Sequence, residues 1–200
     1  MIYIAHRKNT IDELIETDLK YGVEIDLRSH NGNIILHHDP MSVGEDFDNW
    51  LRYYNHNFLI LNVKEEGLET SIVKYLYKYK IENYFFLDQS IPFLIKHSKL
   101  CNRQSAARVS EYESIESALR LKNFANWIWL DQFNKFPVNP SEFEILKANK
   151  FRICLVSPEL QARNDNSEII AIVNTLKQNN LKLDAICSKK CELWEKLLYE

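Results

Sequence analysis

The feature that most constrains the fold is a regular alternation of short apolar runs with longer amphipathic segments. The apolar runs are expected to be strands: Ile2–His6, Val23–Leu27, Phe58–Val63, Tyr84–Leu87, Ala106–Val109, Trp127–Leu130, Arg152–Val156 and Ala185–Cys187. Segments of helical pattern separate most of them: Thr10–Lys20, Leu68–Lys80, Pro92–His97, Ser114–Leu121, Ser141–Asn149, Ser167–Asn179 and Cys191–Tyr199. Strands and helices in alternation predict a parallel sheet with helices outside it.

Two α/β arrangements satisfy this pattern. Eight strands in 200 residues leave about 25 residues for each unit, which is short for a (β/α)8 barrel of about 250 residues. We therefore expect a compact (β/α)8 TIM barrel with some short or missing helices, in one domain over residues 1–200. An open, doubly wound sheet is the alternative.

Local signals place several helix starts. Thr10 with Glu13, and Ser110 with Glu113, have the spacing of a capping box, in which side chains bond the free N–H groups of a first helical turn. The segment Asn31–Leu36 opens with an Asn-Gly pair typical of a tight turn, so an extended excursion is expected there rather than a helix.

Composition excludes several classes of function. With 25 Lys and Arg against 28 Asp and Glu, the chain lacks the basic stripe of a nucleic-acid-binding protein. The 4 glycines are too dispersed for a Gly-rich nucleotide cradle. No apolar run approaches the roughly 18 residues of a membrane span, and no secretory signal pattern opens the sequence. The 4 cysteines form no C-x-x-C pair and are expected to be reduced thiols in a cytoplasmic protein.

Glu24 and Asp26 are the first residues with an evident chemical role. In a strand, residues two apart project to the same side, so the two carboxylates lie together and repel each other. A hard divalent cation such as Mg²⁺ or Ca²⁺, which prefers oxygen ligands, would resolve the repulsion. The alternative is a solvated edge carrying ordinary exposed acids.

Histidines lie close to this pair in the sequence. His6 ends the first predicted strand, and Arg7 follows it. His37 and His38 are adjacent in an extended segment, so only one of them can face the same side as the site. Two imidazoles beside a cation suit phosphodiester cleavage, since one takes the proton of the nucleophile and the other protonates the leaving oxygen. Arg7 has the fork that binds phosphate oxygens. The alternative for His6 is a hydrogen-bonded core histidine.

The runs IAHRKNT and GVEIDLRSHNGNIILHHDP resemble the glycerophosphodiester phosphodiesterase family, within the phospholipase-C-like phosphodiesterase barrels. The family pattern of H-R, N-T, E-x-D, a D-G-like turn and H-D falls on His6 and Arg7, Asn9 and Thr10, Glu24 and Asp26, Gly32, and His38 and Asp39.

This resemblance implies a TIM barrel with its site at the C-terminal face and Mg²⁺ or Ca²⁺ as cofactor. It also implies that His6 and His38 are the acid–base pair, that Glu24 and Asp26 are metal ligands, and that Arg7 contacts phosphate.

The sequence departs from the family pattern in two places. Only Lys8 separates Arg7 from Asn9, where the family usually carries more residues. The third strand usually supplies E-x-K, and aligning the lysine on Lys64 puts Asn62 in place of the carboxylate. An amide oxygen can bind a metal but brings no charge, so weaker metal binding is expected. Lys64 is expected near the phosphate as a point charge.

Later runs of the chain resemble a poorly characterised bacterial subgroup of the same barrels. These runs are FLDQS, ARVSEYE, WIWLDQF, LVSPEL and LDAICSK, and they place polar residues at strand ends: Asp88, Arg108, Glu111, Asp131, Ser157 and Glu159. We expect Arg108 and Asp131 to face the substrate. Each of these polar residues is equally compatible with a helix cap or an outer salt bridge.

The sequence therefore predicts a metal-dependent phosphoric diester hydrolase acting on a small, glycerophosphodiester-like or phosphorylated glycan or lipid substrate. The alternative is a non-catalytic module on the same barrel that binds a phosphorylated ligand through Arg7, Lys64 and Arg108, a view that Asn62 favours. Phosphorolytic or cyclising chemistry is a third, weaker option.

Overall fold

The computed structural model describes residues 1–199. Its strands are β1 (Ile2–Ala5), β2 (Gly22–His30), β3 (Asn33–Leu36), β4 (Glu45–Asp46), β5 (Leu59–Val63), β6 (Tyr84–Leu87), β7 (Ala106–Val109), β8 (Trp127–Leu130), β9 (Arg152–Val156) and β10 (Ala185–Ser188). Its helices are α1 (Ile11–Glu16), α2 (Phe47–Leu51), α3 (Glu69–Lys78), α4 (Ile91–His97), α5 (Ile115–Arg120), α6 (Pro140–Ala148), the 3-10 turn η1 (Pro158–Gln161), α7 (Asn166–Gln178) and α8 (Cys191–Tyr199).

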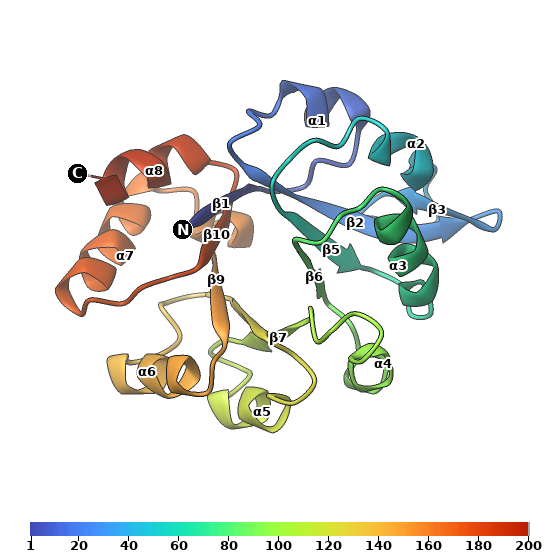
Figure 1. Cartoon of the computed structure of the whole chain (residues 1–200). Helices are drawn as coiled ribbons and strands as arrows, with labels where there is room; N and C mark the ends of the chain where they lie inside the picture. Colours follow the sequence, from blue (N-terminus) through green and yellow to red (C-terminus); the bar gives the residue numbers. More distant parts are fainter. Residues whose placement is uncertain (200) are drawn as a thin grey trace.

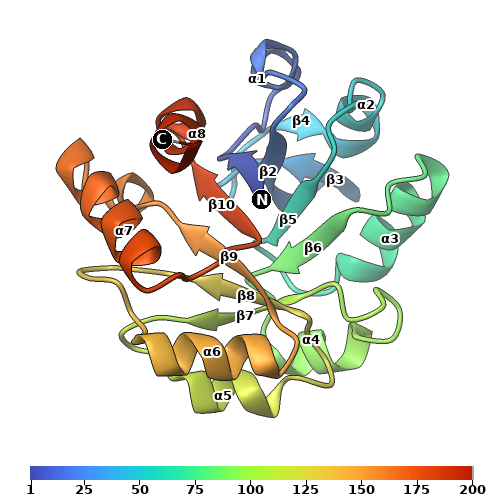
Figure 2. The same cartoon turned by 60° about the vertical axis from the view of Figure 1, so that its left-hand side comes forward.

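Parallel strands form a curled sheet with helices outside it (Figures 1 and 2). Strand β1 pairs with both β2 and β10, so the first and last strands close one side of the ring. The order continues through β5 and β6 on one side and through β9, β8 and β7 on the other. Between β6 and β7 the structure has a single bridge, from Phe86 to Ser105, which leaves a weakly bonded seam. The expected TIM-barrel fold is confirmed, with this incomplete seam.

The core has two layers. An outer layer fills the space between strands and helices, and an inner cluster fills the barrel itself. Trp127 and Trp129 belong to the inner cluster, and the ring of Trp127 lies 4.7 Å from that of Phe85 and 5.3 Å from that of Phe58, centroid to centroid. The two tryptophans fill the barrel, so its interior is a packed core and not a channel.

Two local predictions have different outcomes. Thr10 and Glu13 form the expected capping box at α1. Ser110 and Glu113 do not start a helix, because the Ser110 hydroxyl bonds the Glu113 carboxylate and also accepts from the Tyr112 N–H, which closes a turn. The helix α5 begins after Ser114 instead.

The excursion after β2 is a hairpin. Strand β2 pairs with β3 in antiparallel register, and β3 pairs with β4. Asn31 and Gly32 connect β2 to β3 with φ of 50° and 83°, as a two-residue hairpin turn requires. The hairpin carries the chain back to the C-terminal ends of the barrel strands, where the segment with His38 follows β3. No helix in residues 1–199 has the length and apolar character needed to cross a membrane.

Candidate active site

Strand β2 and its neighbour β5 position the acidic pair. Glu24 and Asp26 alternate along β2 with apolar residues of the outer core, so both carboxylates lie on the same side of the strand. Asp26 is in register with Asn62 of β5, which brings the Asn62 amide beside the two carboxylates. Glu24 and Asp26 are each 1% exposed, so the alternative of a solvated edge with exposed acids is wrong.

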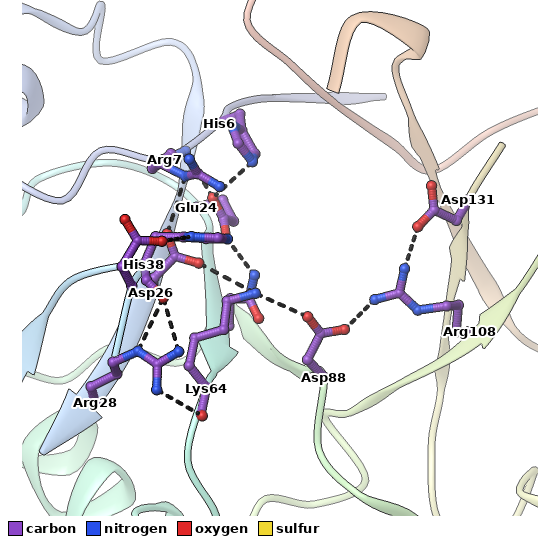
Figure 3. Close-up of polar contacts among 12 residues, drawn as sticks. His6, Arg7, Glu24, Asp26, Arg28, His38, Lys64, Asp88, Arg108 and Asp131 are labelled. Carbon is purple, nitrogen blue, oxygen red and sulfur yellow. Dashed lines mark hydrogen bonds and ion pairs between the residues drawn. The ribbon is translucent and has the colours of Figure 1, made fainter. Parts of the chain in front are cut away.

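Glu24 is held by three partners (Figure 3). Its Oε2 accepts from the backbone N–H of Arg7 at 2.7 Å, and its Oε1 accepts from Asn62 Nδ2 at 3.0 Å. His6 Nε2 lies 3.7 Å from Oε2. Burial, followed by the charge of Asp26, raises the pKa of Glu24 above its ordinary value. The carboxylates of Glu24 and Asp26 therefore repel each other, and these hydrogen bonds offset the repulsion only in part.

Asp26 is bound by residues of the loop after β1. Asn9 Nδ2 donates to Asp26 Oδ2 at 2.9 Å, and the Asp26 backbone N–H donates to Asn9 Oδ1, also at 2.9 Å. Arg7 Nε lies 3.3 Å from Oδ2, and Lys64 Nζ lies 3.6 Å from Oδ1. Arg7 has a positive φ of 53°, a costly conformation for a non-glycine residue, and its backbone N–H donates to Glu24.

Three buried atoms in this cluster have no hydrogen-bond partner within residues 1–199. They are Asp26 Oδ1, Asn62 Oδ1 and His6 Nδ1. A buried polar atom without a partner costs about 1–3 kcal/mol, so a group of three indicates a place kept for a ligand. No three His, Cys, Asp or Glu side chains of the described chain form a metal cluster. Two carboxylates with the amide oxygen of Asn62 nevertheless form a hard oxygen set that fits Mg²⁺ or Ca²⁺.

The two candidate histidines have different surroundings. Burial, followed by the charge of Arg7, lowers the pKa of His6 to about 3, so its imidazole is neutral in the free protein. His38 is more exposed, and its Nδ1 lies 2.8 Å from the Asp39 carboxylate. The His38 carbonyl accepts from Arg28 Nε and Nη2 at 3.0 and 2.9 Å, which fixes its backbone at the rim. His37 instead bonds the Asp39 main chain through its Nδ1.

A chain of alternating charges crosses the rim from β5 to β8 (Figure 3). Lys64 Nζ, which contacts Asp26, also lies 3.1 Å from Asp88 Oδ2. The other Asp88 oxygen pairs with Arg108, whose second terminal nitrogen pairs with Asp131. Asp131 is buried and also accepts from Gln161 Nε2 at 2.7 Å. Arg108 and Asp131 therefore do contact each other, as an ion pair across the mouth from the histidines.

The structure brings seven of the predicted site residues together on β1, β2, β5 and the segments that follow β1, β3 and β5: His6, Arg7, Glu24, Asp26, His38, Asn62 and Lys64. Two other strand-end candidates are engaged in holding loops. The buried Glu159 carboxylate bonds the hydroxyls of Ser157 and Ser188. Glu111 accepts from three successive backbone N–H groups of residues 133–135.

Sequence reasoning missed two residues that shape the site. Arg28 lies two residues beyond Asp26 on β2, so the alternation that pairs Glu24 with Asp26 also includes Arg28, and it bonds both the His38 and the Lys64 carbonyls. Asp88 was noticed only as a strand-end residue. Its place between Lys64 and Arg108 depends on a positive φ of 59° and has no sequence signal.

Comparison with known proteins agrees with this geometry at the level of the fold. No family model and no curated protein matches the sequence. A solved structure from Agrobacterium tumefaciens, provisionally named a glycerophosphoryl diester phosphodiesterase, has a TM-score of 0.71 and 14% identity, over 99% of this chain and 97% of its own. A glycerophosphodiester phosphodiesterase of the same organism has a TM-score of 0.67 and 11% identity, over 98% and 99%. The chain has the fold of these phosphodiesterase structures.

Proposed function

We propose that this protein is a divalent-metal-dependent phosphoric diester hydrolase. The observation that carries the proposal is the pair of buried oxygens that accept no hydrogen bond within residues 1–199, Asp26 Oδ1 and Asn62 Oδ1, beside Glu24 and its neighbour His6. Buried oxygens without partners favour a cation, and histidines at a cation favour proton transfer to and from ester oxygens. The fold shared with phosphodiesterase structures is consistent with this chemistry but does not by itself establish it.

Glu24, Asp26 and Asn62 would hold Mg²⁺ or Ca²⁺. When bound, the cation supplies positive charge to a phosphoryl oxygen and so favours attack at phosphorus. Arg7 and Lys64, which contact Asp26 in the free protein, orient the phosphate through its remaining oxygens. Asn9 keeps Asp26 in place through its two hydrogen bonds.

The histidines divide the proton transfers. The neutral His6 has an acceptor nitrogen, and an anionic phosphate bound beside it raises its pKa by opposing the charge of Arg7. His6 then accepts the proton of the nucleophile. The Asp39 carboxylate accepts from His38 Nδ1, which orients the imidazole, and His38 gives its proton to the leaving oxygen.

The proposed substrate is a small phosphodiester of the glycerophosphodiester type or a phosphorylated glycan or lipid. Arg108 and Asp131, at the far side of the mouth, are proposed to contact its substituent. The chain is proposed to act as one domain in the cytoplasm, which the four buried, unbridged cysteine thiols support.

A non-catalytic phosphate-binding module is the second candidate, and one observation favours it. Arg7, Lys64 and Asn9 already balance Asp26, and Asn62 Nδ2 already bonds Glu24, so the acidic pair is tolerated without a metal. Such a module would bind phosphate in the presence of a chelator and would hydrolyse nothing.

Hydrolysis of bis-(p-nitrophenyl) phosphate and of glycerophosphodiesters, with Mg²⁺, Ca²⁺ and Mn²⁺ in turn, tests the proposal. We expect turnover that EDTA abolishes and that His38→Ala lowers by about 10²–10⁴-fold, the usual contribution of a general acid. His37→Ala is the matched control and should retain activity. Turnover with no metal, or equal loss in both variants, would contradict the proposal. Phosphorus NMR of the products separates hydrolysis from cyclisation and phosphorolysis.

A further inference from the structure

The weakly bonded seam of the barrel opens into a pocket. Within residues 1–199, the bridge from Phe86 to Ser105 is the only one between β6 and β7, so no further ladder pair joins these two strands toward the rim. A cavity of about 640 Å³ lies there, between the strand ends and the helices α4 and α5. This volume is in the range of small-molecule sites. Its rim residues include Asp88 and Arg108, the middle of the charge chain.

The lining of the pocket is part apolar and part polar. Its apolar residues include Leu87, Leu94, Ala107, Ala118 and Leu121. Two large apolar side chains flank the mouth and are exposed: Ile91 at 58% and Tyr112 at 75%. An alkyl or aryl group in the pocket would cover this surface, and burial of apolar area is favourable by itself.

The charges at the pocket mouth are already paired. The Arg108 guanidinium contacts Asp88 and Asp131, and its Nε lies 3.9 Å from Glu113 Oε2. Three carboxylates thus surround one cation, so a second anionic group on a ligand would be repelled rather than held. The pocket suits an uncharged substituent.

A second cavity provides a contrast. A pocket of about 320 Å³ beside His6 is lined by Lys8, Lys189 and Lys190, as well as by acidic residues. Polar or charged groups of a ligand would find partners there. The pocket at the seam has a larger share of apolar lining residues, so the two cavities favour substituents of different polarity.

One lysine connects the seam pocket to the proposed phosphate position. Lys64 Nζ lies 3.6 Å from Asp26 Oδ1 and 3.1 Å from Asp88 Oδ2. Asp26 is a proposed metal ligand, and Asp88 is at the pocket mouth. We propose that the seam pocket binds an uncharged, apolar alkyl or aryl substituent of the phosphodiester. This inference rests on the proposed function, because it places the phosphate at Asp26 and Lys64.

Two model diesters that differ in one chain test the pocket. Dimethyl phosphate and hexyl methyl phosphate carry the same single charge, and their affinities are measured by ligand-observed NMR titration with Mg²⁺. We expect the hexyl ester to bind at least tenfold more tightly to the unchanged protein. Ser117→Phe, on the exposed face of α5 where Ser117 lines the pocket, should fill the cavity and abolish that preference.

Ser71→Phe makes the same substitution at an exposed position of α3 that lines no described cavity and should leave the preference intact. Equal affinities for the two diesters, or an undiminished preference in Ser117→Phe, would overturn the pocket assignment alone. Failure to bind either diester would contradict the phosphate position as well. Hydrolysis of bis-(p-nitrophenyl) phosphate reports on the proposed function separately from both.

Discussion

The two sides of the barrel mouth differ in how completely the oxygens of their buried aspartates accept hydrogen bonds. Around β1, β2 and β5, three buried polar atoms lack hydrogen-bond partners within residues 1–199. Around β7 and β8, both oxygens of Asp131 are engaged by Arg108, Gln161 and the Gln132 N–H, and the buried Gln132 Oε1 next to it lacks a partner within residues 1–199. Both sides contain buried acids, so acidity alone does not distinguish them.

This difference favours one side as the ligand site. A protein that leaves buried carboxylate oxygens unpaired loses stability unless something else satisfies them, whereas a fully bonded carboxylate stabilises the fold. We therefore propose that the side with β1, β2 and β5 holds the chemistry and that the β7–β8 side shapes the mouth. Substitutions of matched residues on the two sides test this proposal.

Replacing a buried aspartate on each side should give the largest contrast. Asp26→Asn removes a proposed metal ligand and should lower kcat by roughly a thousandfold, because a bound cation contributes several kcal/mol to the transition state. Asp131→Asn weakens a buried ion pair and should instead lower the free energy of unfolding by about 1–3 kcal/mol, with a far smaller loss of kcat, because Asp131 is proposed to contact only the substituent and not the phosphate. Urea unfolding and steady-state kinetics measure the two effects.

The reverse pattern would contradict the distinction. If Asp131→Asn abolished turnover while keeping its stability, the chemistry would belong to the β7–β8 side. Both variants keep the side-chain shape, so lost packing cannot account for either outcome.

Asp88→Asn tests the junction between the two sides. Asp88 neutralises both Lys64 and Arg108, and asparagine tolerates the positive φ of 59° at this position. Freeing the two cations should tighten the binding of inorganic phosphate by about tenfold, a Coulomb effect appropriate to a partly exposed site. Inhibition by phosphate measures it, with Glu113→Gln as the control that touches Arg108 only at 3.9 Å. Weaker phosphate binding in Asp88→Asn would show that Asp88 positions the cations rather than competing for them.

A smaller effect concerns pH and His6. Its pKa of about 3 in the folded protein lies below the ordinary value of about 6.5, so the unfolded chain binds more protons between these values. Stability due to His6 should therefore fall as the pH drops from about 6.5 toward 3. With EDTA present, His6→Asn should reduce the slope of the free energy of unfolding against pH by up to about 1.4 kcal/mol per pH unit in this range. His30→Asn, at the hairpin tip, is the control, and parallel profiles for His6→Asn and the unchanged protein would contradict the burial of a neutral His6.

The barrel fold could be predicted from the sequence because each of its strands has a distinct local sequence pattern. Trp127–Leu130 and Phe58–Val63 are short, β-rich and bounded by polar residues, and both are strands in the structure, with β5 beginning at Leu59. The helix α2 went unpredicted because it has only five residues, Phe47–Leu51, too few for a helical period to be visible. Its stability comes from burying Phe47 and Trp50, a tertiary effect.

The part of the candidate site that depends on the alternation of side chains along one strand could be predicted from the sequence. Glu24 and Asp26 lie on the same side of the strand because they are two residues apart, and side chains alternate between the two faces of any strand. The register that puts Asn62 beside Asp26 was not predictable, because it depends on how β2 and β5 pair. Likewise, the contacts of Asp88 join β6 to two other strands, and no local pattern encodes them.

The most direct test of the central claim is to count divalent ions bound to the purified protein. Electron paramagnetic resonance of a Mn²⁺ titration reports free and bound ion, with Asp26→Asn compared to the unchanged chain. We expect the wild-type protein to bind one Mn²⁺ ion per chain, which Mg²⁺ or Ca²⁺ displaces. We expect Asp26→Asn to bind none at the same concentrations. An unchanged protein that binds no ion, or a variant that binds it equally well, would contradict a cation site at Glu24, Asp26 and Asn62.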